Sequence, residues 1–217
     1  MFVTFEGIDG SGKTTQIQLM AEHLRAAGHK VTMTREPGGS IGAEEIRRLL
    51  LSGETDRWSA ETEILLFTAA RRDHLEKTVM PALAAGEIVL CDGFVDSTRA
   101  YQGMRGSNLR EMVDDLHARM IPLDPDLTIL LDFDPGEGLA RSLQRLAGTA
   151  SAEDRFEKAG VSFQEGLRAA YLRIAARFPE RITILSASGT PAEVADRIGM
   201  VIDARLSARD NAPGFPV

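Results

Sequence analysis

Cysteine is almost absent from this 217-residue chain, which contains only Cys91. A single cysteine cannot form an internal disulfide, so the sequence predicts a reducing compartment and a cytoplasmic location. No apolar run approaches the ~18 residues of a membrane-spanning helix, and the opening MFVTFEG lacks the basic segment of a signal peptide. We therefore expect neither membrane insertion nor export.

Positive charge is also in short supply, because the formal net charge is -7. Proteins that bind nucleic acids or membrane surfaces gather positive charge, so we expect neither kind of partner. Lysine occurs at only four positions, against 21 arginines. Any phosphate chemistry must therefore depend on a few well-placed cations.

Short apolar runs alternate with stretches of helical periodicity, which is the pattern of βαβ units around a parallel sheet. The expected strands span residues 2–5, 31–34, 88–91, 127–131 and 182–185. One expected helix follows the first strand and ends near Gly28. The others span 59–85, where Pro81 bends the last turns, 109–120, 136–146, 163–178 and 192–206. The sequence thus predicts an α/β fold in three layers, with helices on both faces of a five-stranded parallel sheet.

No repeat or linker divides the chain, so we expect one domain over residues 1–207. Residues 146–160 are small, polar and charged between two helices, as a short lid over an active site would be, although a plain surface loop has the same composition. Residues 208–217 contain two prolines and no periodicity, and we expect a flexible tail there.

The stretch FEGIDGSGKTTQ carries the strongest motif, because Gly7, Gly12, Lys13 and Thr14 match G-x-x-x-x-G-K-[ST]. It follows an expected strand and opens an expected helix, the context of a phosphate-binding P-loop. Backbone N–H groups and the helix N-terminus would bind phosphate, Lys13 would bridge the outer phosphates and Thr14 would ligate Mg²⁺. The residues expected to bind the nucleotide are Gly7, Asp9, Gly10, Ser11, Gly12, Lys13, Thr14 and Thr15.

P-loops occur in switches, motors and small-molecule kinases. A guanine-specific switch needs an Asn-Lys-x-Asp motif, but the chain has two asparagines and neither precedes a lysine. Asp92 and Asp132 each end an expected strand, at the sheet edge where ligands of such folds bind. Either could reach Mg²⁺ or its waters, or could cap the next helix. Thr14 and Asp92 are the expected metal ligands.

Four further segments accompany the loop: TREPGG at 34–39, EEIRRLLL at 44–51, LLFTAARRDHL at 65–75 and DSTRAYQG at 96–103. Together they resemble the bacterial thymidylate kinase family, whose members transfer the γ-phosphate of ATP to dTMP. The resemblance runs from about Phe2 to about Leu206. It implies a P-loop NTPase-type fold, ATP and dTMP as substrates, and a homodimer packed through helices.

The resemblance also implies a dTMP site. Phe67 and Arg71 are four residues apart and share one helical face; the likeness implies that Phe67 stacks on thymine while Arg71 bonds its carbonyl. Thr98 and Gln102 match positions at the base edge, and Tyr101 matches the ring beside the sugar 2′ position. The complete implied dTMP set is Asp9, Glu36, Pro37, Arg47, Phe67, Arg71, Thr98, Tyr101 and Gln102, with a cis bond before Pro37 and with Arg48 at the surface.

For catalysis, the P-loop interior contains no arginine, so positive charge must reach the transferring phosphate from elsewhere. The resemblance assigns that role to arginines in and beside the lid. Arg168 matches a further arginine near the phosphates, and residues 186–190 match the loop beside adenine. The expected catalytic residues are Lys13, Asp9, Arg141, Arg145 and Arg155.

One position departs from the family pattern. Members carry Asp-Arg followed by an aromatic residue after the third strand, whereas this chain has Asp92, Gly93 and Phe94. Glycine cannot donate to a phosphate, so we expect a weakened acceptor-phosphate site unless Arg71 or Arg99 compensates. Two alternatives stay open at this point: a kinase for another nucleoside or nucleotide, and a nucleotide-binding protein with weak turnover.

Overall fold

The computed structural model describes residues 1–52, 57–147 and 160–210. Its centre is one five-stranded sheet in the order β2-β3-β1-β4-β5, and every neighbouring pair is parallel. The strands are β1 (Phe2–Glu6), β2 (Val31–Arg35), β3 (Ile88–Asp92), β4 (Leu127–Asp132) and β5 (Ile182–Ser186). All five expected strands are confirmed, and each is one residue longer than expected.

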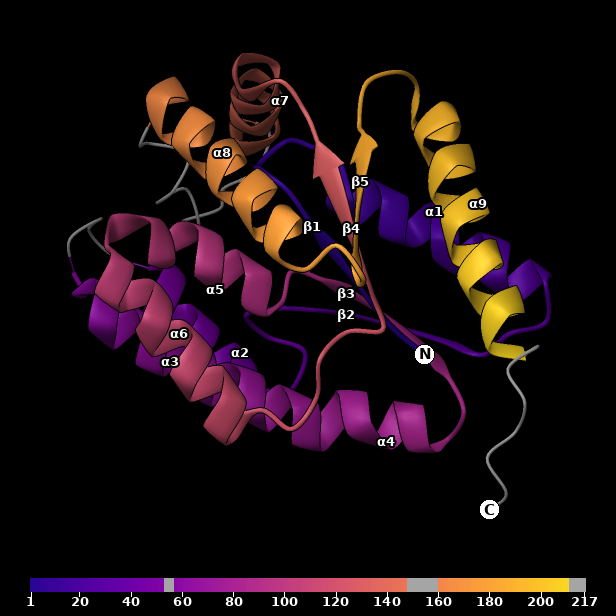
Figure 1. Cartoon of the computed structure of the whole chain (residues 1–217), viewed down its shortest axis with the longest axis horizontal. Coiled ribbons are helices and arrows are strands. Elements are labelled where there is room, and N and C mark those ends of the chain that lie inside the picture. The colour runs from indigo at the N-terminus through magenta and orange to yellow at the C-terminus, as the bar shows by residue number, and fades with distance from the viewer. Residues whose placement is uncertain (53–56, 148–159, 211–217) are drawn as a thin grey trace.

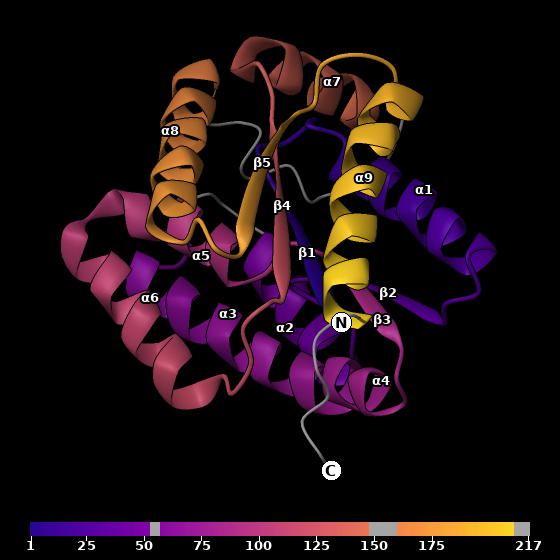
Figure 2. The same cartoon turned by 45° about the vertical axis from the view of Figure 1, so that its right-hand side comes forward.

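Helices cover both faces of the sheet, which confirms the three-layer α/β architecture. Figure 1 shows α1 and α9 on one side of the strands and α3, α5, α6 and α8 on the other. The turned view in Figure 2 shows the same division. The helices are α1 (Lys13–Ala26), α2 (Ile41–Leu51), α3 (Ala60–His74), α4 (Met80–Ala84), α5 (Val95–Tyr101), α6 (Ser107–Met120), α7 (Pro135–Ala147), α8 (Val161–Arg177) and α9 (Pro191–Asp210).

The central strands β1, β3 and β4 are buried along almost their whole length because helices cover both faces of the sheet, whereas the edge strands β2 and β5 are partly exposed. Along β1, Phe2 packs in a cluster with residues of α3 and α6, while Val3 and Phe5 belong to a second cluster with α1 and α9. At the end of β1 lies Glu6, a charged residue with no exposed surface. A carboxyl group at that depth requires hydrogen-bonding partners.

Several helical segments differ from expectation. The long helix begins as expected after Ser59 and ends at Ala84, but a π-helical turn, Leu75–Val79, separates α3 from α4. Pro81 lies in the first turn of α4 and has no N–H to donate, so the wider turn adjusts the backbone just before it. Helices α2 and α5 were not among the expected helices, and the seven residues of α5 are too few to show a periodic pattern.

The remaining expectations concern the chain's surface and ends. None of the helices in the described ranges is long and apolar enough to cross a membrane. Helix α9 continues to Asp210, past the expected end of the helix at residue 206. Most of the expected lid, at 148–159, and the last seven residues of the expected tail lie outside the described residues.

Candidate active site

The loop after β1 closes on the side chain of Lys13. Its Nζ donates to the carbonyl oxygens of Gly7 at 2.8 Å and Ile8 at 3.0 Å, so the ammonium group lies inside the loop. Gly12 precedes α1 in the left-handed region, with φ of 94°, and no side chain caps this helix. The first N–H groups of α1 therefore face the loop without a side-chain acceptor, which is the arrangement that binds an anion.

Glycine is required at two positions of this loop by close packing. A Cβ on Gly10 would lie 2.0 Å from the carbonyl oxygen of Gly138 in α7, and one on Gly7 would lie 2.6 Å from that of Leu131. Both glycines also have positive φ, 74° and 143°. The loop thus packs directly on the backbone of β4 and α7, and any side chain at these positions would displace it.

The expected metal ligands lie next to each other. Thr14, in the first turn of α1, donates from its hydroxyl to Oδ2 of Asp92 at 2.6 Å. Asp92 ends β3, whose register places it beside Phe5 of β1. Within the described ranges, no three side chains of His, Cys, Asp or Glu form a metal-binding group. A cation here would take few ligands from the protein and the remainder from phosphate oxygens and water, as Mg²⁺ usually does.

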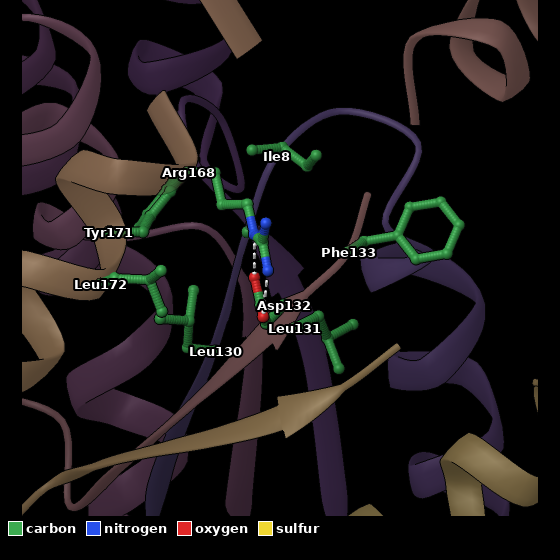
Figure 3. Close-up of a pocket in the computed structure, with 9 residues that line it drawn as sticks. Ile8, Leu130, Leu131, Asp132, Phe133, Arg168, Tyr171 and Leu172 are labelled. Atoms are coloured by element: carbon green, nitrogen blue, oxygen red, sulfur yellow. Dashed lines mark hydrogen bonds and ion pairs between the residues drawn. The ribbon is translucent and has the colours of Figure 1, made fainter. Parts of the chain in front are cut away.

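The second strand-end aspartate has a different partner. Arg168 in α8 donates to both oxygens of Asp132, from Nε at 2.5 Å and from Nη2 at 2.8 Å. Figure 3 shows this guanidinium over the Asp132 carboxylate, with Ile8 of the loop above the pair. Hydrogen bonding to Asp132 raises the pKa of Arg168. Asp132 is therefore held by an arginine, whereas Asp92 bonds the hydroxyl of Thr14 beside the P-loop.

On the other side of β1, Arg71 joins α3 to two other elements. Its Nε donates to Oε2 of Glu36 at 2.7 Å, and its Nη2 donates to the hydroxyl of Thr98 at 2.9 Å. The guanidinium lies 5.1 Å from the centre of the Phe94 ring. The second Glu36 oxygen lies 3.0 Å from Nδ1 of His74, which has no exposed surface. Arg71 is therefore fixed in place, with a charged partner that sequence reasoning did not assign to it.

Three more expected residues lie near α5, the helix that contains Thr98. The hydroxyl of Tyr101 donates to Oδ2 of Asp9 at 3.0 Å, which links α5 to the P-loop. Gln102 donates from Nε2 to the buried carboxylate of Glu63 at 2.9 Å. Phe67 is half-buried on α3, on the same helical face as Arg71. The structure thus brings the P-loop, α3 and α5 together at one end of the sheet.

The bond between Glu36 and Pro37 is cis, as expected. Arg47 in α2 donates to the Pro37 carbonyl oxygen at 2.7 Å, while its neighbour Arg48 is exposed, also as expected. Arg141 in α7 lies 4.2 Å from the centre of the Phe133 ring. The side chain of Arg145 and the whole of Arg155 lie outside the described residues.

Gly93 has φ of 77°, and a Cβ there would meet the Glu36 carbonyl oxygen and the Ser97 hydroxyl, each at 3.3 Å. Arg99 does not compensate for the missing arginine, because it pairs with Asp96 and Asp114 instead. Arg71 bonds the side chain of Glu36, the residue whose carbonyl oxygen a Cβ at position 93 would meet.

Glu6 connects the P-loop to the turn that contains Gly93. Its carboxyl oxygens accept from the N–H groups of Phe94 at 2.8 Å and Ser97 at 3.2 Å, and from the Ser97 hydroxyl at 2.5 Å. The Tyr171 hydroxyl of α8 lies 3.1 Å away. Burial, and then the charge of Asp96, raise the pKa of Glu6 from 4.5 to about 8. Glu6 was not among the expected site residues, although a lone charged residue after an apolar run is a visible signal in the sequence.

The raised pKa of Glu6 makes stability depend on pH. The folded chain keeps the Glu6 proton up to about pH 8, whereas the unfolded chain releases it near pH 4.5. Between these values the unfolded state binds fewer protons, so the free energy of unfolding falls as pH rises, by up to about 1.4 kcal/mol per pH unit. Below this window the contribution is complete, and above it the contribution is lost.

Glu6→Gln removes this titration while keeping an acceptor for Phe94 and a donor for Ser97 or Tyr171. We expect its unfolding free energy, measured by urea denaturation from pH 5 to pH 8, to fall less with rising pH than that of the unmodified chain. Parallel pH profiles for the two proteins would show that Glu6 does not titrate in this window.

Comparisons with known proteins agree over nearly the whole chain. A family model described as thymidylate kinase matches residues 5–198. A protein named thymidylate kinase from Ruegeria pomeroyi is 56% identical over 207 residues, which is 95% of this chain and 96% of the relative. Its counterpart from Caulobacter vibrioides is 48% identical over 206 residues, 94% of this chain and 97% of the relative. A crystal structure of thymidylate kinase from Ehrlichia chaffeensis matches with a TM-score of 0.74 at 33% identity, covering 93% of this chain and 98% of that one.

Proposed function

The chain belongs to the thymidylate kinase family, and we propose that it carries out dTMP phosphorylation where the P-loop meets α3 and α5. ATP would bind to the loop through Gly7, Asp9, Gly10, Ser11, Gly12, Lys13, Thr14 and Thr15. The dTMP base would bind between Phe67, Arg71, Thr98 and Gln102, with the sugar at Tyr101 and Asp9. The dTMP phosphate would reach Arg47, beside the Glu36–Pro37 bond.

The main observation that supports this proposal is the contact between Tyr101 and Asp9. It joins a residue of the ATP loop to a residue of the dTMP side at 3.0 Å, so one carboxylate lies at the border of the two sites. In-line transfer requires the attacking phosphate oxygen and the γ-phosphorus to lie close together. Because Asp9 belongs to both proposed sites, it supports a position of the dTMP phosphate next to the γ-phosphate of ATP.

The reaction needs little covalent chemistry from the protein. An anionic oxygen of the dTMP phosphate forms a bond to the γ-phosphorus while the bond from that phosphorus to the β,γ-bridging oxygen breaks, leaving ADP and dTDP. Since the nucleophile is already anionic near neutral pH, the chain supplies position and positive charge rather than a base. Lys13 would meet the charge on the outer phosphates, with Arg141, Arg145 and Arg155 as the other proposed cations.

We propose Mg²⁺ as the resident cation beside Thr14 and Asp92. The two side-chain oxygens lie 2.6 Å apart and are of the hard type that Mg²⁺ prefers. When bound, the ion would neutralise phosphate charge and orient the ATP oxygens.

Direct measurement of dTDP tests these assignments. We expect ATP and dTMP to give dTDP only when Mg²⁺ is present, and excess EDTA to stop the reaction reversibly. Hydrolysis of ATP without dTMP should be slow, because water is a poor substitute for a positioned acceptor. Metal-independent dTDP formation, or equally fast ATP hydrolysis without dTMP, would contradict the proposal.

Gly93 offers a test of the acceptor-phosphate site. We expect Gly93→Arg to lower the KM for dTMP severalfold or raise kcat, because a guanidinium would gain access to the phosphates. The left-handed backbone at this position penalises any side chain by about 1–2 kcal/mol. Gly93→Ala is the matched control, since it imposes the same backbone strain without the charge. If the arginine and alanine variants have equal kcat and equal dTMP KM, the absent arginine does not limit this enzyme.

We also propose a homodimer and a cytoplasmic location. Leu65 on α3 and Met80 on α4 are about half exposed, at 52% and 44%, on the long helical segment that we propose to pack between copies. The lone cysteine, Cys91, is a buried free thiol, which is consistent with a reducing compartment. Sedimentation at two protein concentrations would establish the oligomeric state.

A further inference from the structure

Glu63 is a buried carboxylate that no substrate contact accounts for. It lies in the first turn of α3 and has no exposed surface. It accepts a hydrogen bond from Nε2 of Gln102 at 2.9 Å, and Nη1 of Arg105 lies 3.7 Å from the same oxygen. Burying a carboxylate at this depth has a large desolvation cost, which points to a role for Glu63 beyond packing.

The partner of Glu63 is itself buried and only half satisfied. Gln102 is 1% exposed, and its side-chain oxygen, Oε1, has no hydrogen-bond partner among the described residues. An amide side chain can in principle be turned around, which exchanges its donor and its acceptor. With the Arg105 cation beside the same oxygen, the Glu63 carboxylate serves as an acceptor, so it holds the amide nitrogen toward itself and leaves Oε1 as the group that faces elsewhere.

Two hydrogen bonds between α3 and α5 enclose the proposed base site. One joins Arg71 to Thr98, and the other joins Glu63 to Gln102. Phe67 lies on α3 midway between Glu63 and Arg71, four residues from each, and so on the same helical face. A base stacked on Phe67 would have the Arg71 donor at one end of its edge and the Gln102 acceptor at the other.

That order of donor and acceptor matches only one kind of pyrimidine. Thymine presents an acceptor at O4 and a donor at N3–H, whereas cytosine presents a donor at the 4-amino group and an acceptor at N3. We propose that Glu63 is a positioning residue that selects thymine over cytosine by holding the Gln102 amide with its oxygen toward N3. This inference rests on the proposed function, because it assumes that the dTMP base binds beside Phe67.

Glu63→Gln tests the role with almost no change of shape. Glutamine can donate as well as accept, so the Gln102 amide loses its fixed direction. We expect the ratio of kcat/KM for dTMP to that for 5-methyl-dCMP, which keeps the thymine methyl group, to fall roughly tenfold or more. The change should appear mainly in the acceptor KM, while the KM for ATP stays the same. Glu61→Gln, on the exposed side of the same helix, should leave the ratio unchanged.

Further variants separate orientation from a structural role. Gln102→Met should also lower the ratio, and adding Glu63→Gln to it should lower the ratio no further, because Glu63 acts through Gln102. Glu63→Asp keeps an acceptor-only group and should retain most of the selectivity. If Glu63→Gln is folded and has the original ratio, or if the two substitutions are additive, the proposal is overturned. Should Glu63→Gln fail to fold, Glu63→Asp and the Gln102→Met ratio decide instead.

The same experiment distinguishes this inference from the proposed function. If the unmodified chain forms no dTDP, the proposed function fails. Calorimetric binding of dTMP and 5-methyl-dCMP to the full chain would still report selectivity. Selective dTMP binding that Glu63→Gln abolishes would support the role of Glu63, and unselective binding by the unmodified chain would overturn it.

Discussion

Replacing Lys13 with methionine is expected to lower kcat for dTDP formation by roughly 10³-fold or more. Removal of a single uncharged donor from a charge-stabilising site costs about 10²–10³-fold, and Lys13 carries a full charge to the transferring group. Methionine has similar length and bulk, so the change removes the charge with little change of volume. It also removes the bonds from Lys13 to the carbonyl oxygens of Gly7 and Ile8.

The measurement is the rate of dTDP formation at saturating ATP and dTMP, with thermal unfolding as a check on folding. Lys30→Met is the matched control, because Lys30 is exposed and lies outside the loop. It should have the activity of the unmodified chain. If Lys13→Met retained a tenth or more of the original kcat, phosphate transfer would have to take place at another position.

Arg71→Lys is expected to raise the KM for dTMP on the order of 10²-fold, with little effect on the KM for ATP. The guanidinium reaches Glu36 and Thr98 at the same time, and the flat Phe94 ring lies beside it. An ammonium group keeps the charge, so Glu36 keeps a cationic partner, but it lacks the planar fork that makes several directed bonds. Each lost bond to a charged group is worth about 1.5–3 kcal/mol.

Arg72→Lys provides the control at the neighbouring position. Arg72 is about half exposed and pairs with Glu76 one turn along the helix, so its replacement should change neither KM. Arg71→Met is a harsher variant, because it leaves the Glu36 carboxylate without its cationic partner and should cost about 3–5 kcal/mol of stability. Equal dTMP KM values for the lysine variants at 71 and 72 would exclude Arg71 from the acceptor site.

Much of the fold could be predicted because its signals are local. Strands β1, β3 and β4 are short, largely apolar runs that are buried along almost their whole length, and the long helix after Ser59 has many turns over which to show its period. The P-loop was predictable because the spacing of its glycines and Lys13 reflects a single backbone requirement. Helix α5 was missed because its stability comes from tertiary contacts, among them the Glu6 bonds to Phe94 and Ser97 at its N-terminus.

The side-chain partners of the site residues were harder to predict from the sequence. The pairing of Phe67 with Arg71 follows from their spacing, but the pairing of Arg71 with Glu36 joins residues 35 positions apart and depends on the fold. Asp92 and Asp132 looked equivalent as strand-end carboxylates until Arg168, on a distant helix, proved to bind Asp132. Glu63 carried a weaker signal, since it lies four residues before Phe67 on the same face.

The central claim is tested most directly by the rate of ADP release from Mg²⁺-ATP, with dTMP, dUMP, dCMP, thymidine or no acceptor. We expect the highest kcat/KM with dTMP and dTDP formed in equal amount to ADP. Thymidine should be inactive, because it lacks the phosphate oxygen that attacks. Turnover that is equal for all acceptors, or that needs none, would contradict the account of a thymine-reading kinase.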